Sequence, residues 1–243
     1  FTAGDLILNS INGDTGTKDR PIYTYADTIG AMGNNVNIIN LKDTKIDQII
    51  ADEEVNIQSE GDITDAKPQN DDNNIISGST DLTADGDIGG EDEPIKIQTD
   101  EFSGEGENVY IDSDGDIVID HIGAEEDVVI TTDGSVTDKP ENDGKPAIDS
   151  ENLEIDAGGA VGSQDNPLDI NVPGEVDVTS RLDLVFLRRH GPSHPAVTWP
   201  GKVNHPAYLF ADENGRIRPD APLTRGEAAR MIYILLGMPQ SPS

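Results

Sequence analysis

Residues 86–95 read Gly-Asp-Ile-Gly-Gly-Glu-Asp-Glu-Pro-Ile, and the same frame occurs before and after this stretch. The frame starts at positions 13, 86 and 159, so the two intervals between its copies are equal and define a 73-residue repeat. The shared landmarks are Gly13, Gly16, Asp19, Pro21 and Ile22 in the first copy, and Gly159, Gly162, Asp165, Pro167 and Leu168 in the third. Five landmarks at two equal spacings indicate an internal repeat, whose third copy ends near residue 180.

Within one repeat the apolar residues form short alternating pairs. These pairs are Ile95 and Ile97, Val109 and Ile111, Ile117 and Ile119, Val128 and Ile130, and Leu153 and Ile155. Alternation with period two, with β-branched residues on one side and polar residues on the other, is typical of β-strands. Clusters of Gly, Asp, Asn and Pro separate the pairs and favour turns. The sequence therefore predicts many short strands.

These features predict an all-β fold for residues 1–180: a parallel β-helix or solenoid, which we expect to be right-handed, with several coils per repeat and about 2.5 copies of the repeat. Only 34% of the residues are apolar and 4% aromatic, which is low for a thick core but sufficient for a narrow one. Val109 and Ile111 are expected to point into this core. The alternative is an antiparallel sandwich built from a tandem repeat.

The charge is distributed unevenly along the 243 residues, whose formal net charge is −32. Residues 1–180 contain 43 acidic and 8 basic side chains, whereas residues 181–243 contain 5 and 8. A chain this acidic is not expected to bind nucleic acid, because phosphate recognition requires a cationic surface. The break in composition predicts a domain boundary near residue 180.

Two further absences in the sequence restrict the class of protein. The chain has no cysteine, which excludes disulfides and thiolate metal sites. It also has no apolar run long enough to cross a bilayer, so no membrane span is expected. Because it begins at Phe1 without a starter Met or a signal peptide, we interpret it as a fragment or mature portion of a larger product.

The Gly-x-x-Gly, Asp-x-Pro-Ile/Leu frame followed by Val/Ile pairs resembles the β-helical repeats of large bacterial filamentous adhesins and surface proteins. The resemblance covers roughly residues 1–180 and implies a fold more than a function. Polysaccharide lyases and hydrolases also include β-helices, so a carbohydrate-active enzyme remains an alternative. Such an enzyme would need convergent carboxylates in a cleft. His121, the one imidazole of this segment, is interpreted as a turn or surface residue.

The acidic run Asp112-Ser113-Asp114-Gly115-Asp116 does not match a calcium loop. An EF-hand needs Gly at its sixth position and Glu at its twelfth, but counting from Asp112 these positions are Ile117 and Gly123. The glycine-rich nonapeptide of calcium-loaded solenoids is absent too. We expect no cofactor and no metal site, with at most weak, non-specific binding of divalent cations to the acidic surface.

The remaining residues divide into a proline-rich linker at 181–204 and an element at 205–243, which is expected to be mostly irregular with one short helix. Thr224 and Glu227 have the spacing of a capping box at the start of that helix. Ala228, Met231, Ile232 and Leu235 would share one face, and Gly237 is placed to end the helix.

The string Gly215-x-Ile217-x-Pro219, followed by Leu223-Thr224-Arg225-Gly226-Glu227, resembles the second half of a surface-layer homology (SLH) motif. The resemblance implies a non-catalytic module that holds extracellular proteins on the cell envelope by binding cell-wall polysaccharide. In that family the Thr-Arg-Ala/Gly-Glu element lines the glycan groove. This implies that Thr224, Arg225, Gly226 and Glu227 form the cell-wall-glycan-binding site, and no catalytic or metal site is expected.

Taken together, the sequence predicts a non-catalytic bacterial cell-surface protein, located outside the cell or in its wall. Its solenoid would act as a shaft for adhesion or display, and its tail would be the anchor. The expected partners are cell-wall polysaccharide and a host or microbial surface glycan or protein. The alternatives are a carbohydrate-active β-helix enzyme tethered to the wall, and a pure binding module whose solenoid face recognises a glycan.

Overall fold

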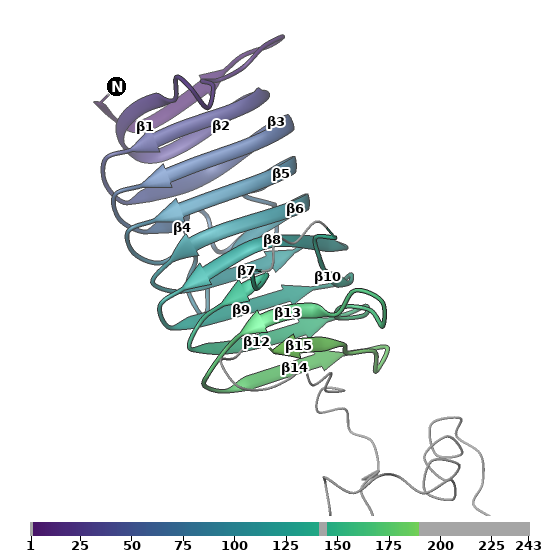
Figure 1. The fold of residues 1–243 in the computed structure, drawn as a ribbon. Coiled ribbons are helices and arrows are strands. Elements are labelled where there is room, and N and C mark those ends of the chain that lie inside the picture. Colours follow the sequence, from purple (N-terminus) through teal and green to yellow (C-terminus); the bar gives the residue numbers. More distant parts are fainter. Residues whose placement is uncertain (1, 141–144, 190–243) are drawn as a thin grey trace, which may run out of the picture. The chain divides into compact units, whose positions relative to one another are not determined.

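The computed structural model describes residues 2–140 and 145–189, and these residues form a parallel β-solenoid of about eight turns. Figure 1 shows the coils stacked one below the other, with the N-terminal strand at one end of the rod and the last strands at the other. Every pairing between its strands is parallel. The predicted all-β parallel solenoid is therefore confirmed, and the antiparallel sandwich is wrong.

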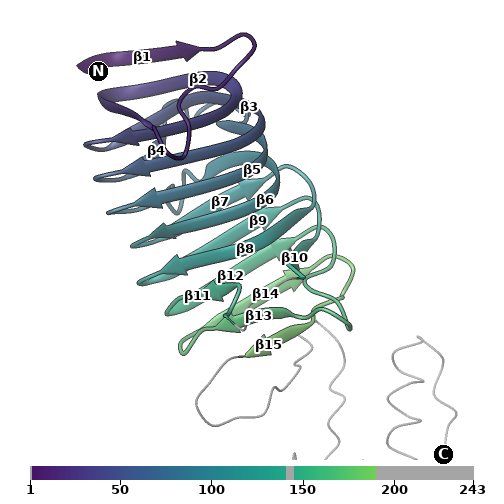
Figure 2. The same cartoon turned by 45° about the horizontal axis from the view of Figure 1, so that its top comes forward.

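The described residues contain 15 strands in one continuous sheet. They are β1 (Thr2–Asn9), β2 (Ile22–Asn40), β3 (Thr44–Ser59), β4 (Ile63–Asp65), β5 (Ile75–Ala84), β6 (Ile95–Gly106), β7 (Val109–Ser113), β8 (Ile117–Ala124), β9 (Asp127–Thr132), β10 (Val136–Asp138), β11 (Ile148–Asp149), β12 (Asn152–Ala157), β13 (Leu168–Asn171), β14 (Val176–Ser180) and β15 (Leu187–Arg189). The long strands β2, β3, β5 and β6 bend around the rod, as Figure 2 shows most clearly.

Inward Ile, Val and Leu side chains stack into the narrow core that the alternation predicts. Val109 is fully buried and Ile111 is 1% exposed, so the predicted orientation of this pair is confirmed. Within the described residues the fully buried aromatic side chain is Phe102 on β6. Stacked rungs of medium-sized aliphatic residues explain how a chain so poor in aromatics still has a continuous core.

The 73-residue repeat does not match a whole number of coils. The stack that begins at Thr15 passes through β2, β3, β5, β6, β8 and β10 and reaches Val161. Val161 is thus seven coils from Thr15, and it is also two repeats from Thr15 in the sequence. One repeat therefore spans three and a half coils. Ile88, the equivalent of Thr15 in the second copy, accordingly lies in a different stack, between Ile63 and Val109.

This half-integer ratio determines how the copies of the repeat stack. Equivalent strands of successive copies do not hydrogen-bond to each other. They lie in the two separate stacks, which we call the Thr15 stack and the Ile88 stack. The first and third copies share a stack, because Val161 pairs with Val136 and Val185 on either side of it. The frame loops of successive copies therefore alternate between the Thr15 stack and the Ile88 stack.

One glycine of the repeat frame is required by its backbone geometry. Gly16, Gly89 and Gly162 have φ angles of 79°, 73° and 64°, a region that other residues rarely adopt. At each of the three, a Cβ atom would overlap the carbonyl oxygen of a residue on a neighbouring coil, namely Asn37, Tyr110 or Phe186. The glycine that identifies the repeat in the sequence therefore permits the close approach of adjacent coils.

Small polar side chains occupy the inner corner where several strands end. Ser59 donates a hydrogen bond to the Lys42 carbonyl at 2.8 Å, and Thr132 donates one to the Gly115 carbonyl at 2.6 Å. Ser180 bonds the Gly159 carbonyl at 2.6 Å in the same way. These bonds satisfy turn carbonyls that would otherwise be buried without a partner.

The chain divides into two units, residues 1–203 and 204–243, and the described residues belong to the first. Stacking continues past residue 180, because β13 pairs with β15 and Val161 pairs with Val185. The proposed linker beyond residue 189 and the whole 205–243 element, including its predicted helix, lie outside the described residues. In the part that is described, no helix has the length and hydropathy needed to cross a membrane.

Candidate functional site

Many of the acidic side chains on one side of the rod have a structural role. Immediately before each rung of the Ile88 stack, an Asp or Asn side chain accepts a hydrogen bond from the residue one coil further on, at 2.8 to 3.3 Å. The ladder consists of Asp43, Asp62, Asp87, Asn108, Asp127, Asn152 and Glu175. It fixes the register between coils, so this acidity need not indicate a ligand.

A groove of about 710 Å³ lies over β7, β9, β12 and β14, beside this ladder. We call it the Tyr110 groove. It is lined by Glu91, Asp92, Tyr110, Asp127, Val128, Val129, Thr131, Asn152, Leu153, Glu154, Glu175 and Asp177. Its floor is a column of outward side chains in register, in which Tyr110 is paired with Val129, Val129 with Glu154, and Glu154 with Asp177. The groove therefore has an apolar start and an acidic continuation.

Six carboxylates and no basic side chain line the Tyr110 groove. Partial burial raises the pKa of the Tyr110 phenol, and the nearby charges of Asp127, Asp87, Glu91 and Glu126 raise it further. The phenol therefore stays protonated and neutral at physiological pH. A neutral aromatic ring next to carboxylates is suited to a cationic ligand with an aliphatic stem.

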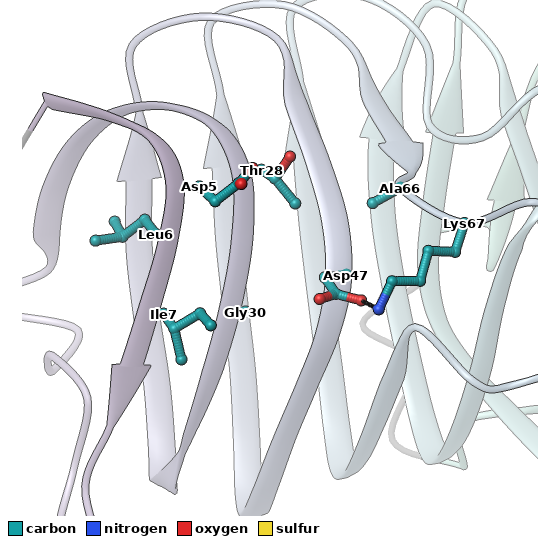
Figure 3. Close-up of a pocket in the computed structure, with 8 residues that line it drawn as sticks. All are labelled: Asp5, Leu6, Ile7, Thr28, Gly30, Asp47, Ala66 and Lys67. Carbon is teal, nitrogen blue, oxygen red and sulfur yellow. Dashed lines mark ion pairs between the residues drawn. The ribbon is translucent and has the colours of Figure 1, made fainter.

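A second, smaller depression of about 320 Å³ lies at the N-terminal end of the rod (Figure 3). Asp5, Leu6 and Ile7 of β1 form one side of it, and an ion pair between Lys67 and Asp47 closes the other. Ile7 is 79% exposed. Because its carboxylate Asp47 is already paired with Lys67, this depression offers less free charge than the Tyr110 groove.

The residues singled out in the sequence fall in different places. The predicted glycan-binding residues Thr224, Arg225, Gly226 and Glu227 lie outside the described residues. His121 is half-buried on β8, with Nδ1 3.2 Å from the Pro146 carbonyl oxygen. Among the residues that the structure describes, no three His, Cys, Asp or Glu side chains are grouped so as to hold a metal ion.

The Asp112–Asp116 run forms the end of β7 and the turn that follows it. Asp116 Oδ1 accepts the Ser135 amide at 2.7 Å, a bond equivalent to that between Asp43 and Asp62 one repeat earlier. Burial raises the pKa of Asp112, the positive charge of Lys96 opposes this, and Asp133 and Asp114 add to it. The run is part of the coil-to-coil bonding.

The Tyr110 groove was not predicted from the sequence. Its residues are scattered between positions 91 and 177, and only the stacking of successive coils brings them together. One signal was present in the repeat alignment, because Glu91 stands one repeat after Lys18, and Tyr110 one repeat after Asn37. Such exchanges between copies mark positions where the same backbone carries side chains of different chemistry.

Comparison of the chain with protein-family models, with curated proteins and with solved structures gives no match.

Proposed function

We propose that the chain is a non-catalytic bacterial cell-surface protein whose solenoid serves as a shaft for adhesion or display. The single observation that carries this proposal is the stack of about eight turns from β1 to β15, in which the residues that the structure describes include no inserted domain. Each coil adds about 4.8 Å to the length of such a stack. A repeat that extends length with few aromatic residues is suited to spacing one functional part from another.

The distribution of apolar surface supports a shaft. Exposed large apolar side chains in the described residues are confined to the two end regions: Ile7, Ile11, Tyr23, Tyr25, Met32 and Leu41 near the start, and Leu182 and Leu184 near the end. Between residues 42 and 181 the described sides of the rod are polar and mostly acidic. A surface of this kind stays hydrated and resists lateral aggregation.

The anchoring part of the proposal rests on the sequence of residues 205–243. The capped helix start that the sequence predicts at Thr224 and Glu227, with Arg225 beside it, would provide backbone N–H groups and a guanidinium fork for an anionic sugar substituent. Cell-wall polysaccharide is the partner proposed for this element.

The anchor is tested by sedimentation of the full chain with purified cell-wall polysaccharide. We expect Arg225→Ala to reduce the bound fraction about tenfold, which corresponds to loss of one charge-assisted contact. Arg189→Ala, at the end of β15, is the matched control and should bind as well as the wild type. Equal retention of wild type and Arg225→Ala would remove this residue from the proposed site.

The non-catalytic part is tested separately. Incubation with a panel of acidic polysaccharides should release neither new reducing ends nor unsaturated products. Sustained release of such products in proportion to the protein concentration would contradict the non-catalytic proposal and favour the carbohydrate-active enzyme.

A further inference from the structure

The two complete copies of the repeat carry opposite charges at one outward position, Lys18 in the first and Glu91 in the second. In the first copy the frame loop contains Lys18, whose Nζ lies 2.7 Å from Glu54 Oε1. The hydrogen bond with Glu54 raises the pKa of Lys18, and the charges of Glu54 and Asp81 act in the same direction. The ammonium group of Lys18 thus pairs with Glu54 on β3, two coils further along the rod, and lies within the electrostatic influence of Asp81 on the coil after that.

The second copy has the same backbone at this place. Thr17 and Arg20 exchange two backbone hydrogen bonds of 3.1 and 2.9 Å, and Gly90 and Glu93 exchange two of 3.0 Å. Gly16 and Gly89, which precede these loops, both have positive φ angles. The backbone that holds Lys18 beside Glu54, which we call the seat, is therefore repeated on the Ile88 stack.

The side chains around the repeated seat are acidic without the lysine. One repeat after Glu54 and Asp81 stand Asp127 and Glu154, both of which line the Tyr110 groove. One repeat after Lys18 stands Glu91, which also lines the groove. The acidic residues that receive the ammonium are kept, and the residue that supplies it has become a third carboxylate.

We propose that the Tyr110 groove binds a lysine side chain of a partner polypeptide, in the seat that Lys18 fills internally in the first copy. The partner is an extended, lysine-rich segment. Its ammonium would be held by Glu91, Glu154 and the Oδ2 atom of Asp127, whose Oδ1 accepts the Asn152 amide in the ladder. Its aliphatic stem would lie against Tyr110 and Val129. The chain already places an ammonium near a tyrosine ring, since Lys42 Nζ is 5.3 Å from the ring centre of Tyr25.

The length of the groove fits more than one lysine of such a segment. The floor continues from Val129 to Glu154 and Asp177, one residue per coil, and rungs are about 4.8 Å apart. In an extended peptide alternate side chains are about 7 Å apart on one face. Successive lysines can therefore reach carboxylates on successive or alternate coils. This inference does not depend on the proposed location at the cell surface.

Fluorescence anisotropy with a labelled octalysine peptide tests the proposal on the full chain. The key variant is Glu91→Lys, which fills the seat from within as Lys18 does in the first copy. The matched control is Glu60→Lys, an exposed residue between β3 and β4 with the same change in charge. We expect Glu91→Lys to weaken binding at least about tenfold and Glu60→Lys to change it less than about twofold at physiological ionic strength. Circular dichroism checks that both variants fold.

The converse variant should create a site. Lys18→Glu vacates the seat of the first copy, so titration should change from one peptide per chain to two. Asp127→Asn, which keeps the carbonyl oxygen that accepts the Asn152 amide, is a second loss variant and should also weaken binding.

Three results would overturn the proposal. The first is equal weakening by Glu91→Lys and Glu60→Lys, which would indicate a general charge effect. The second is equal binding of an octapeptide whose lysines are acetylated. The third is tight binding of Ca²⁺ that depends on Glu91 and displaces the peptide at micromolar concentration, which would make the groove a metal site.

Discussion

The two complete copies of the repeat share a backbone but differ in charge. Residues 13–85 contain 15 acidic and 5 basic side chains, whereas residues 86–158 contain 23 and 3. The first copy neutralises several carboxylates internally, through Lys18 with Glu54, Lys42 with Asp27, and Lys67 with Asp47. In the second copy, Lys139 is placed between Glu101 and Asp120. The inward and turn positions therefore determine the coil, and the outward positions vary without altering it.

The difference shows which residues the stack depends on. Inward positions stay buried from one copy to the next. Val36 and Ile38 correspond to Val109 and Ile111, and the buried Thr44 and Thr80 correspond to the buried Ile117 and Leu153. Outward positions exchange lysine for glutamate at Lys18 and Glu91. Substitutions that disturb a buried position should consequently have large effects in either copy, and outward charges should have small ones.

The largest effect is expected where an ion pair is buried between copies. Lys96 Nζ lies 3.1 Å from Asp65 Oδ2, and the Asp65 side chain is 0% exposed. Lys96→Met would leave this carboxylate without its cation, so we expect the free energy of unfolding to fall by about 3 kcal/mol. Urea denaturation at pH 7 measures the loss.

Asp169 stands one repeat after Lys96. Arg188 Nη1 from the next coil lies 3.6 Å from Asp169 Oδ2. The Arg188 side chain is 45% exposed, so Arg188→Met should cost less than about 1 kcal/mol. A larger loss for Arg188→Met than for Lys96→Met would contradict the assignment of the buried pair as the stronger contact.

The fold could be predicted from the sequence because the residues that create it are local and periodic. Gly16, Gly89 and Gly162 marked the repeat, and pairs such as Val109 and Ile111 marked the inward face. The half-coil offset could not be predicted, because the length of each coil depends on loops whose path the sequence does not specify. The Tyr110 groove depends on which residues of successive coils are paired, so its residues could be recognised individually but not as one site.

A medium effect is expected where the two copies fill the core differently. Ile29 and Ala31 of the first copy correspond to Phe102 and Gly104 of the second, and Ile29 and Phe102 are both fully buried. A Cβ atom on Gly104 would lie 3.0 Å from Phe102 Cε1 and 3.1 Å from Cζ. The absence of a side chain at Gly104 therefore makes room for the Phe102 ring, which is larger than the Ile29 side chain of the first copy.

A double-mutant cycle tests this exchange of volume. Gly104→Ala alone should destabilise the rod by about 1 to 3 kcal/mol through overpacking, and Phe102→Ile alone by about 1 kcal/mol through a cavity. The double variant, which restores the pair found in the first copy, should be more stable than Gly104→Ala alone. Strictly additive losses in thermal and urea unfolding would show that the two positions do not compensate each other.

The smallest effect is expected at an outward carboxylate, Asp81 of the first copy. Burial raises the pKa of Asp81; Lys18 opposes this, and Glu54, Glu105 and Asp120 contribute to the rise. The folded chain thus binds this proton more tightly than the unfolded chain, in which the pKa is near 3.8. Stability linked to Asp81 is therefore fully present below that value and is lost as the pH rises through the higher pKa of the folded state.

Asp81→Asn removes this loss, so it should raise the free energy of unfolding at pH 7 by less than about 1 kcal/mol and leave it unchanged near pH 3. The matched control is Glu154→Gln at the equivalent, exposed position of the second copy. Because this substitution is at an exposed position, it should change the free energy of unfolding by less than about 0.5 kcal/mol. Thermal unfolding from pH 3 to pH 7 distinguishes the two, and parallel curves for wild type and Asp81→Asn would show that burial at this position does not penalise the charge.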